Sequence, residues 1–187
     1  VPVMLANARL SARSARGYGR IAALVRPAFA SLAGVAAQTP GDAGRLAGLG
    51  AEAVEICGNL KFDVSPPEDR IALGHAWREA IGKRSVWLAA STREGEEALL
   101  LEAWRRVAVA DALLVLVPRH PQRFDAGAAL LQQEGWHFSR RSDGLPTADA
   151  QVWLGDSMGE MVAYYTLADL AFIGGSLLPL GGQNLIE

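Results

Sequence analysis

The sequence predicts an α/β protein, with a Rossmann-like parallel sheet and flanking helices. Short apolar segments of strand length alternate along the chain with longer amphipathic segments, and turns with glycine or proline separate them. Strands that alternate with helices in this way form right-handed βαβ units, in which the strands run parallel. At 187 residues, the chain has room for one α/β domain and part of another.

The first part, residues 1–57, is expected to be the C-terminal remnant of one domain. Its expected elements, in order, are a strand at 3–8, an Ala-rich amphipathic helical stretch at 14–37, a helix at 39–49 and a strand at 54–57. Gly17 and Gly19 weaken the first turn of the amphipathic stretch. Pro40 favours a helix start, because proline at the first helical position loses no needed donor, and Gly50 favours the end of that helix.

The second part, residues 58–187, is expected to be a further α/β domain with a parallel sheet. A turn followed by Pro66 and Pro67 indicates a junction between domains. The expected elements, in order, are a helix at 68–81, a strand at 85–90, a helix at 95–107, a strand at 113–117, a helix at 123–133, strands at 136–139 and 151–154, a helix at 158–167 and a strand at 171–174. Ligands of such sheets bind beyond the carboxyl ends of the strands, so functional residues should lie there.

The composition excludes several classes of protein. Half of the residues are hydrophobic and one-fifth are charged, which is ordinary for a soluble globular protein. No apolar run approaches the ~20 residues of a membrane-spanning helix. The single cysteine, Cys57, excludes an internal disulfide framework and fits a reducing compartment. The three histidines are too scattered to suggest a zinc site.

The opening of the chain is strongly basic. Five arginines precede the first acidic residue, Asp42, and these are Arg9, Arg13, Arg16, Arg20 and Arg26. Such a segment attracts anionic partners such as phosphates or acidic lipid headgroups, and a merely solvated face is the alternative. Nucleic acid is not expected as a partner, because the basic opening has only Tyr18 and Phe29 for base stacking.

Polar residues follow the expected strands at 85–90 and 151–154. Ser91 and Thr92, with the free N–H groups of the next helix, can face a bound anion. Ser91 and Glu94 also have the spacing of a capping box, which is the structural alternative. Ser157 and Glu160 repeat that spacing, and a helix start with an adjacent glycine also lets a nucleotide approach the backbone closely.

The turn after the strand at 113–117 is unusually rigid. Pro118 and Pro121 hold it extended around Arg119 and His120. Arg119 can donate bidentate hydrogen bonds to a phosphate. A surface arginine and a turn histidine are the structural alternative.

The last expected strand leads into a glycine-rich segment. Two glycine pairs, 174–175 and 181–182, suit a close backbone approach to a phosphate or sugar. Asn184 and Glu187 can cap the helix that begins there, and a carboxylate at this place can also accept hydrogen bonds from ribose hydroxyl groups.

Lys61 lies at the expected junction between the two domains. It is one of only two lysines in a chain that otherwise uses arginine. A compact ammonium group at an interdomain cleft is well suited to neutralising a leaving phosphate. A structural turn formed with Asp63 is the alternative.

Together these segments resemble the Kdo transferases, a family of two-domain GT-B glycosyltransferases that transfer 3-deoxy-manno-octulosonic acid (Kdo). The matching segments follow the family order over essentially the whole chain, at residues 7–11, 58–63, 90–97, 118–121, 158–160, 174–176 and 181–187. The sequence departs from the family pattern at Arg93 and Gln183, where the family has histidine.

The resemblance implies transfer of Kdo from CMP-Kdo to a lipid A precursor in lipopolysaccharide biosynthesis, with inversion at the sugar and without a metal ion or other cofactor. It places CMP on Pro118, Arg119, Met158, Gly159, Glu160, Asn184, Leu185, Ile186 and Glu187. Additional donor contacts are expected from Ser91, Thr92, His120 and Ser157. Lys61 is expected to stabilise the transition state.

The implied partners are CMP-Kdo, a lipid A precursor and an anionic membrane surface, at the cytoplasmic face of the Gram-negative inner membrane. The resemblance implies that residues 1–57 are the C-terminal remnant of the N-terminal (acceptor) domain. It implies that residues 58–187 are the nucleotide-sugar-binding domain, truncated at its C-terminus. The family's general base belongs to the N-terminal domain, so these residues are expected to be a soluble fragment that is inactive alone. Two alternatives stay open: a GT-B enzyme that uses a UDP-sugar, and a non-catalytic nucleotide-binding module.

Overall fold

A computed structural model describes residues 1–63, 65–107, 109, 111–179 and 181. The chain divides into two compact units, Val1–Ser65 and Pro66–Glu187. The boundary expected after Cys57 precedes this division, and the intervening residues include the short 3-10 helix Leu60–Asp63. This 3-10 helix therefore belongs to the first unit.

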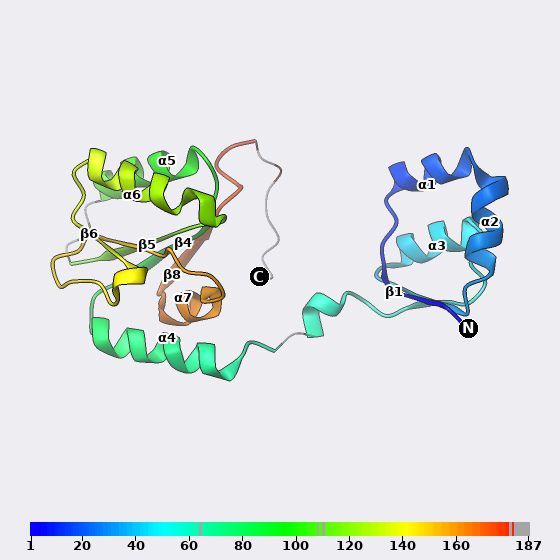
Figure 1. The fold of residues 1–187 in the computed structure, drawn as a ribbon, viewed down its shortest axis with the longest axis horizontal. Coiled ribbons are helices and arrows are strands. Elements are labelled where there is room, and N and C mark those ends of the chain that lie inside the picture. Colours follow the sequence, from blue (N-terminus) through cyan, green and yellow to red (C-terminus); the bar gives the residue numbers. More distant parts are fainter. Residues whose placement is uncertain (64, 108, 110, 180, 182–187) are drawn as a thin grey trace. The chain divides into compact units, whose positions relative to one another are not determined.

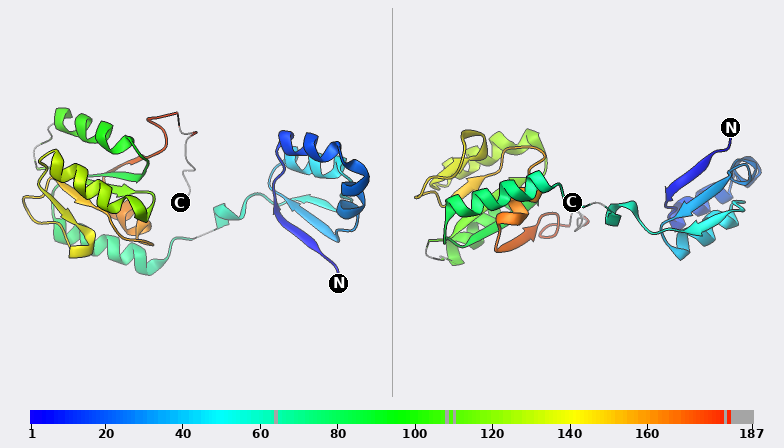
Figure 2. Two further views of the ribbon diagram at one scale, coloured as in Figure 1. Left: turned by 45° about the horizontal axis from the view of Figure 1, so that its top comes forward. Right: turned by 90° about the horizontal axis from the view of Figure 1, so that it is seen from below.

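The first unit is a parallel three-stranded sheet with its helices on one side (Figures 1 and 2). Its strands, in spatial order, are β1 (Met4–Ala8), β2 (Gly34–Ala37) and β3 (Val54–Ile56). The helices are α1 (Ala12–Gly19), α2 (Ala22–Ala30) and α3 (Pro40–Gly48). Val35 and Ala37 of β2 and Leu46 of α3 lie in one buried apolar cluster. This cluster also takes side chains from α1 and α2, so all three helices share one small core.

A buried carboxylate fixes the start of α3. Thr39 is the N-cap, and its hydroxyl group donates to Asp42 while accepting the N–H of that residue at 3.1 Å. Asp42 also accepts the N–H of Leu10 at 2.9 Å, which ties α3 to the segment after β1. The hydrogen bonds from Thr39, Leu10 and Arg45 hold the pKa of Asp42 at about 2. Asp42 is therefore ionised at neutral pH and unites two segments of the unit.

The expected continuous amphipathic stretch at 14–37 is wrong. The chain forms α1, breaks at Arg20 and Ile21, forms α2, and then enters the strand β2. Three of the four residues of β2 are buried, and the strand pairs with β1 on one side and β3 on the other. Small residues in an Ala-rich context carry no strand signal of their own, so tertiary pairing decides the conformation here.

The second unit is a five-stranded parallel sheet with helices on both faces. Its strands, in spatial order, are β6 (Phe138–Arg140), β7 (Val152–Leu154), β5 (Leu113–Pro118), β4 (Val86–Thr92) and β8 (Leu170–Ile173). Its helices are α4 (Glu68–Ile81), α5 (Glu96–Val107), α6 (Phe124–Gln133) and α7 (Met161–Leu167), with short 3-10 turns at Pro121–Arg123 and Arg141–Asp143. The α/β fold class and the parallel sheet are confirmed.

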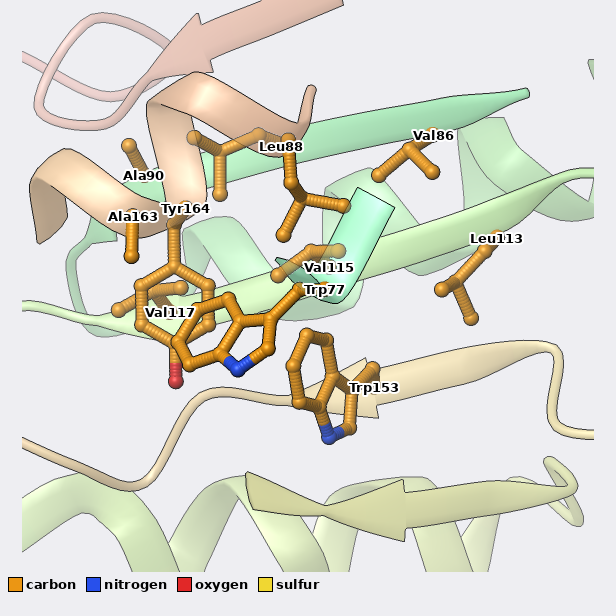
Figure 3. Packing of buried hydrophobic residues seen from close by; sticks show 11 residues of the cluster. Trp77, Val86, Leu88, Ala90, Leu113, Val115, Val117, Trp153, Ala163 and Tyr164 are labelled. Atoms are coloured by element: carbon orange, nitrogen blue, oxygen red, sulfur yellow. The ribbon is translucent and has the colours of Figure 1, made fainter. Parts of the chain in front are cut away.

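Alternate residues of the central strands supply two separate cores. Leu88 and Val115 belong to the cluster beneath α4 and α7, whereas Ala89 and Leu116 belong to the cluster beneath α5 and α6. In the first cluster three rings pack against one another, with centroids 5.1–5.8 Å apart: Trp77, Trp153 and Tyr164 (Figure 3). A central strand buried on both faces explains the continuous apolar run of β5.

Several element boundaries differ from those expected. β4 continues through Ser91 and Thr92, which the sequence placed beyond the strand. α7 begins at Met161 rather than Met158, because a turn with positive φ at Gly159 precedes it. The helix expected to begin near Glu187 lies outside the described residues.

The packing of α4 on α7 depends on Gly74. A Cβ atom at this position would lie 2.5 Å from the Cβ of Thr166 and 2.6 Å from the carbonyl oxygen of Ala163. Both are too close, and one of them is backbone. Helix α4 can therefore approach α7 only with glycine here.

We expect Gly74→Ala to lower the free energy of unfolding of the second unit by about 1–3 kcal/mol, because the two helices must separate. Denaturant titration followed by circular dichroism measures this change. Gly44→Ala is the matched control, since Gly44 lies inside α3 with nothing near its missing side chain. That control should stabilise its own unit by up to about 1 kcal/mol. Unchanged stability of Gly74→Ala would contradict the packing argument.

Candidate functional site

The strand order of the second unit reverses beside β4. From β4 the chain passes to β5 and then outward to β6 and β7, before β8 returns to the other side of β4 (Figure 1). Open parallel sheets bind ligands in the crevice outside the carboxyl ends of the strands at such a point. The carboxyl ends of β4 and β8, with those of β5 and β7 beside them, are therefore the candidate site.

Glu96, the first residue of α5, holds the turn that follows β8. Its side chain is fully buried. Oε1 accepts the N–H groups of Gly175 at 2.8 Å and Leu177 at 3.0 Å, and Oε2 accepts the N–H of Arg93 at 2.9 Å. Burial raises the pKa of this carboxyl group, but the backbone hydrogen bonds, first that of Gly175, outweigh it and leave the pKa below its ordinary value. Glu96 is thus an ionised internal anchor.

The turn after β8 lies tightly against the end of β4. A Cβ atom on Gly174 would lie 2.4 Å from the carbonyl oxygen of Ser91 and 2.7 Å from the Cα of Thr92. Gly175 has φ +84°, which favours glycine. The close approach expected at this glycine pair is made with the protein's own backbone, and the N–H groups of Gly175 and Leu177 serve Glu96.

Glu97 is buried next to Glu96, and its hydrogen-bond partners lie at the end of β4 and after β5. Its Oε1 accepts the hydroxyl group of Thr92 at 3.1 Å, and its Oε2 accepts the guanidinium group of Arg123 at 3.1 Å. Thr92 is fully buried, so its hydroxyl group belongs to this internal network. Ser91 is also buried, and α5 begins only at Glu96. Ser91 is consequently too far from the helix to be its N-cap, and the capping-box alternative for it is wrong.

The turn after β5 lies beside the end of β4. Pro118 is buried and pairs in register with Thr92. The N–H of Arg119 donates to the carbonyl oxygen of Thr92 at 3.0 Å. Arg119 is half-buried and His120 is exposed. The backbone hydrogen bond fixes where Arg119 leaves the sheet, and so places a guanidinium group at the carboxyl ends of two neighbouring strands.

The segment between β7 and α7 is anchored by Asp156. Its carboxylate accepts Nε of Arg140 at 2.7 Å and the N–H of Ser142 at 2.8 Å. Burial raises the pKa of Asp156, but the hydrogen bonds from Ser142 and Arg140 outweigh it and lower the pKa. Gly155 allows the tight entry into this segment, because a Cβ atom there would lie 2.7 Å from Cγ2 of Val117. These contacts fix the segment that carries the next three predicted site residues.

Met158 and Gly159 are exposed, whereas Glu160 is held by its neighbours. Ser157 donates its hydroxyl group to one carboxylate oxygen of Glu160, and Arg141 pairs with the other at 3.0 Å. The N-cap of α7 is Glu160 itself, and no side chain caps it. The capping box that was the structural alternative for Ser157 is therefore wrong as a backbone cap, although the two side chains do meet.

Lys61 belongs to the first unit, where it is exposed within the 3-10 helix Leu60–Asp63. Its N–H donates to Oδ1 of Asn59 at 3.1 Å. Asn7, at the end of β1, accepts the N–H of Leu60 at 3.3 Å and the amide of Gln38 at 2.9 Å. Asn7 has φ +54°, an uncommon conformation that asparagine tolerates better than most residues. The carboxyl end of this smaller sheet therefore holds the Lys61 segment.

The remaining predicted donor-site residues, Asn184, Leu185, Ile186 and Glu187, lie outside the described residues. Within the described part of the chain, no three His, Cys, Asp or Glu side chains are grouped to hold a metal ion. None of the helices that the structure describes has the length and apolarity to cross a membrane.

Comparisons with known proteins identify the family. A family model for 3-deoxy-D-manno-octulosonic-acid transferase (kdotransferase) matches residues 1–64. A 3-deoxy-D-manno-octulosonic acid transferase of Bordetella pertussis is 49% identical over all of this chain and 45% of its own length. The chain belongs to the Kdo transferase family. A further Kdo transferase, from Haemophilus influenzae, is 41% identical over all of this chain and 45% of its own length.

A solved structure supports the same assignment to the Kdo transferase family. The C-terminal CMP-Kdo binding domain of WaaA from Acinetobacter baumannii matches with a TM-score of 0.61 and 35% identity. The match covers 64% of this chain and 65% of that one. The chain spans about half the length of the Kdo transferases of Bordetella pertussis and Haemophilus influenzae.

The sequence did not single out Glu96, Glu97, Asp156 or Asn7 as site residues. Each is a polar residue whose hydrogen-bond partners lie in another segment of the chain. For Glu96 and Glu97, a signal existed in the segment 90–97, which carries part of the family resemblance.

Proposed function

We propose that this chain is the donor-binding part of an enzyme that transfers Kdo from CMP-Kdo to a lipid A precursor and releases CMP. The observation that carries the proposal is the 35% identity to a domain that binds CMP-Kdo. The identity of 49% to a Kdo transferase over the whole chain supports the same reaction. The strand order reverses beside β4, and this is the place where open parallel sheets bind nucleotides.

In this proposal CMP binds at the carboxyl ends of β5, β7 and β8. The segment 118–119 begins with the last residue of β5, and the segment 158–160 lies between β7 and α7. The segment 184–187 follows β8 in the sequence. Arg119 supplies the phosphate with a fork of N–H donors. His120, Ser91 and Ser157 lie next to these segments and are proposed as further contacts.

Lys61 is proposed to stabilise the transition state. Cleavage of the bond between Kdo and the phosphate leaves negative charge on CMP, and an ammonium group lowers the energy of that charge most when water is excluded. An ammonium group supplies positive charge that a metal ion would otherwise provide, so the reaction is proposed to use no metal ion. Inversion at the sugar is proposed with it.

Nucleotide selectivity tests the proposed function. We expect calorimetric titration of the 187-residue chain to show binding of CMP at least tenfold tighter than of UMP, and no binding of a short oligonucleotide. Equal affinity for CMP and UMP would favour an enzyme that uses a UDP-sugar. Tight oligonucleotide binding would contradict the proposal.

Among the proposed site residues, Arg119 is the one whose replacement is expected to weaken CMP binding without lowering stability. Charge-assisted hydrogen bonds are worth about 1.5–3 kcal/mol, so Arg119→Ala should weaken CMP binding by about tenfold to a hundredfold. Arg119→Lys should recover only part of this loss, because an ammonium group cannot reproduce the fork. Calorimetric titration measures both variants, with melting curves recorded without nucleotide.

The matched control is Arg106→Ala, which removes an exposed arginine near the far end of α5. It should leave CMP binding unchanged. Normal CMP affinity in a folded Arg119→Ala protein would remove Arg119 from the site, whereas a large loss of thermal stability would assign it a structural role.

We further propose that the first unit contacts an anionic membrane surface, where the lipid A precursor resides, at the cytoplasmic face of the Gram-negative inner membrane. Arg13 and Arg16 are exposed on α1, and Arg20 is exposed at its C-cap. Their spacing of three and four residues puts them on one side of the helix. Nearby, Ile21 and Leu24 are 52% and 75% exposed. Cations beside exposed apolar side chains suit the boundary between headgroups and acyl chains.

Replacing Arg13, Arg16 and Arg20 together with glutamine should reduce binding to anionic vesicles at low salt, because each cation near such a surface contributes about 1 kcal/mol. Wild-type binding should also weaken as salt rises, since exposed charges are screened within about 10 Å at 0.1 M. Vesicle co-sedimentation measures both effects. The control replaces three arginines of the second unit, of which Arg70 is partly exposed and Arg105 and Arg106 are exposed. Equal loss in the control, or no loss in the test variant, would show that the α1 arginines are only solvated.

A further inference from the structure

We propose that Glu96 is a positioning residue of the donor site, whose carboxylate holds the turn at 174–177 in the conformation required for donor binding. This inference rests on the proposed function, because it assumes that the turn takes part in donor binding. Glu96 does not touch the donor in this proposal. It acts through the backbone of the turn.

The turn is built as a receptor for an anion. Successive backbone N–H groups that point to one side of a turn form a concavity that binds negative charge. The N–H groups of Gly175 and Leu177 converge on Glu96 at 2.7–3.0 Å. The protein therefore fills this concavity with its own carboxylate. A donor phosphate must then find its cations elsewhere, which agrees with the proposed role of Arg119.

The carboxylate leaves the turn few alternative conformations. Glu96 is fully buried, and both of its oxygen atoms accept backbone N–H groups. Gly174 has no space to move toward β4, since even a Cβ atom would meet Ser91 and Thr92. A buried carboxylate that loses these partners would be strongly destabilised, so the turn and the start of α5 should move only together.

The turn lies at the candidate site, so we infer that its conformation affects donor binding as well as stability. It follows β8 at the strand-order reversal, adjacent to the end of β4 that also receives the N–H of Arg119. Asp169 offers the contrast. It accepts the N–H of Val86 at 2.8 Å and so joins the same two strands, β4 and β8, at their opposite ends. Asp169, which also pairs with Arg78 at 3.2 Å, is therefore a carboxylate that joins these strands far from the candidate site, and it serves for comparison.

The variants Glu96→Gln and Asp169→Asn test the proposal. Each replaces a carboxylate with an amide of the same shape. We expect Glu96→Gln to weaken CMP binding by about tenfold or more, because a neutral acceptor holds the turn less firmly. Asp169→Asn should change CMP affinity by less than about twofold. Titration below the melting temperature of each variant compares them, and equal losses in both, or wild-type affinity in Glu96→Gln, would overturn the proposal.

Amide exchange in the wild-type chain tests whether Glu96 or the ligand binds the N–H groups of the turn, even if Glu96→Gln does not fold. The N–H groups of Gly175 and Leu177 should exchange slowly without nucleotide, because Glu96 already holds them. Exchange that is fast without nucleotide and becomes slow only with CMP would show that these groups bind the ligand, and would overturn the proposal. If the wild-type chain does not bind CMP at all, the proposed function is wrong, and this outcome differs from those that overturn the role of Glu96.

Discussion

Hydrogen bonds accepted by two adjacent buried carboxylates organise the carboxyl edge of the larger sheet. Glu96 accepts from the turn after β8, while Glu97 accepts from Thr92 at the end of β4 and from Arg123 after β5. Neighbouring residues of a helix point in different directions, so two positions of α5 can serve loops on either side. Because buried charges must be paired, both loops have to adopt the conformations that satisfy them. The geometry of three strand ends thus follows from the first turn of one helix.

The first unit uses the same physical device at a smaller scale. Asp42 at the start of α3 accepts the N–H of Leu10, and the side chain of Asn7 accepts from Leu60 in the segment that carries Lys61. In both units a polar side chain placed at an element boundary ties down a loop at the carboxyl side of a parallel sheet. Loops placed in this way can hold reacting groups accurately although they are not part of the regular structure.

The order of elements in the larger unit could be predicted because its strands are apolar and its helices amphipathic. β5 is buried over its whole length, and its continuous apolar sequence predicts a buried strand. β2 could not be predicted in the same way, because Gly34–Ala37 becomes a strand only through its pairing with β1 and β3. The role of Glu96 could not be predicted for a similar reason, because it depends on residues far away in the sequence. An acidic residue in the first turn of a helix is common for reasons local to the helix. That Glu96 reaches a turn 79 residues further along depends on the assembled sheet.

The distribution of aromatic side chains gives the two units different optical properties. All five tryptophans lie in the second unit, and two of them, Trp77 and Trp153, are buried in contact with Tyr164. The first unit has no indole group, so excitation near the red edge of protein absorption samples the second unit alone. The emission of Trp77 and Trp153 should shift to longer wavelength when their core becomes hydrated. Far-ultraviolet dichroism reports backbone structure in both units. The chain therefore contains an intrinsic label by which the unfolding of one unit can be followed separately from that of the other.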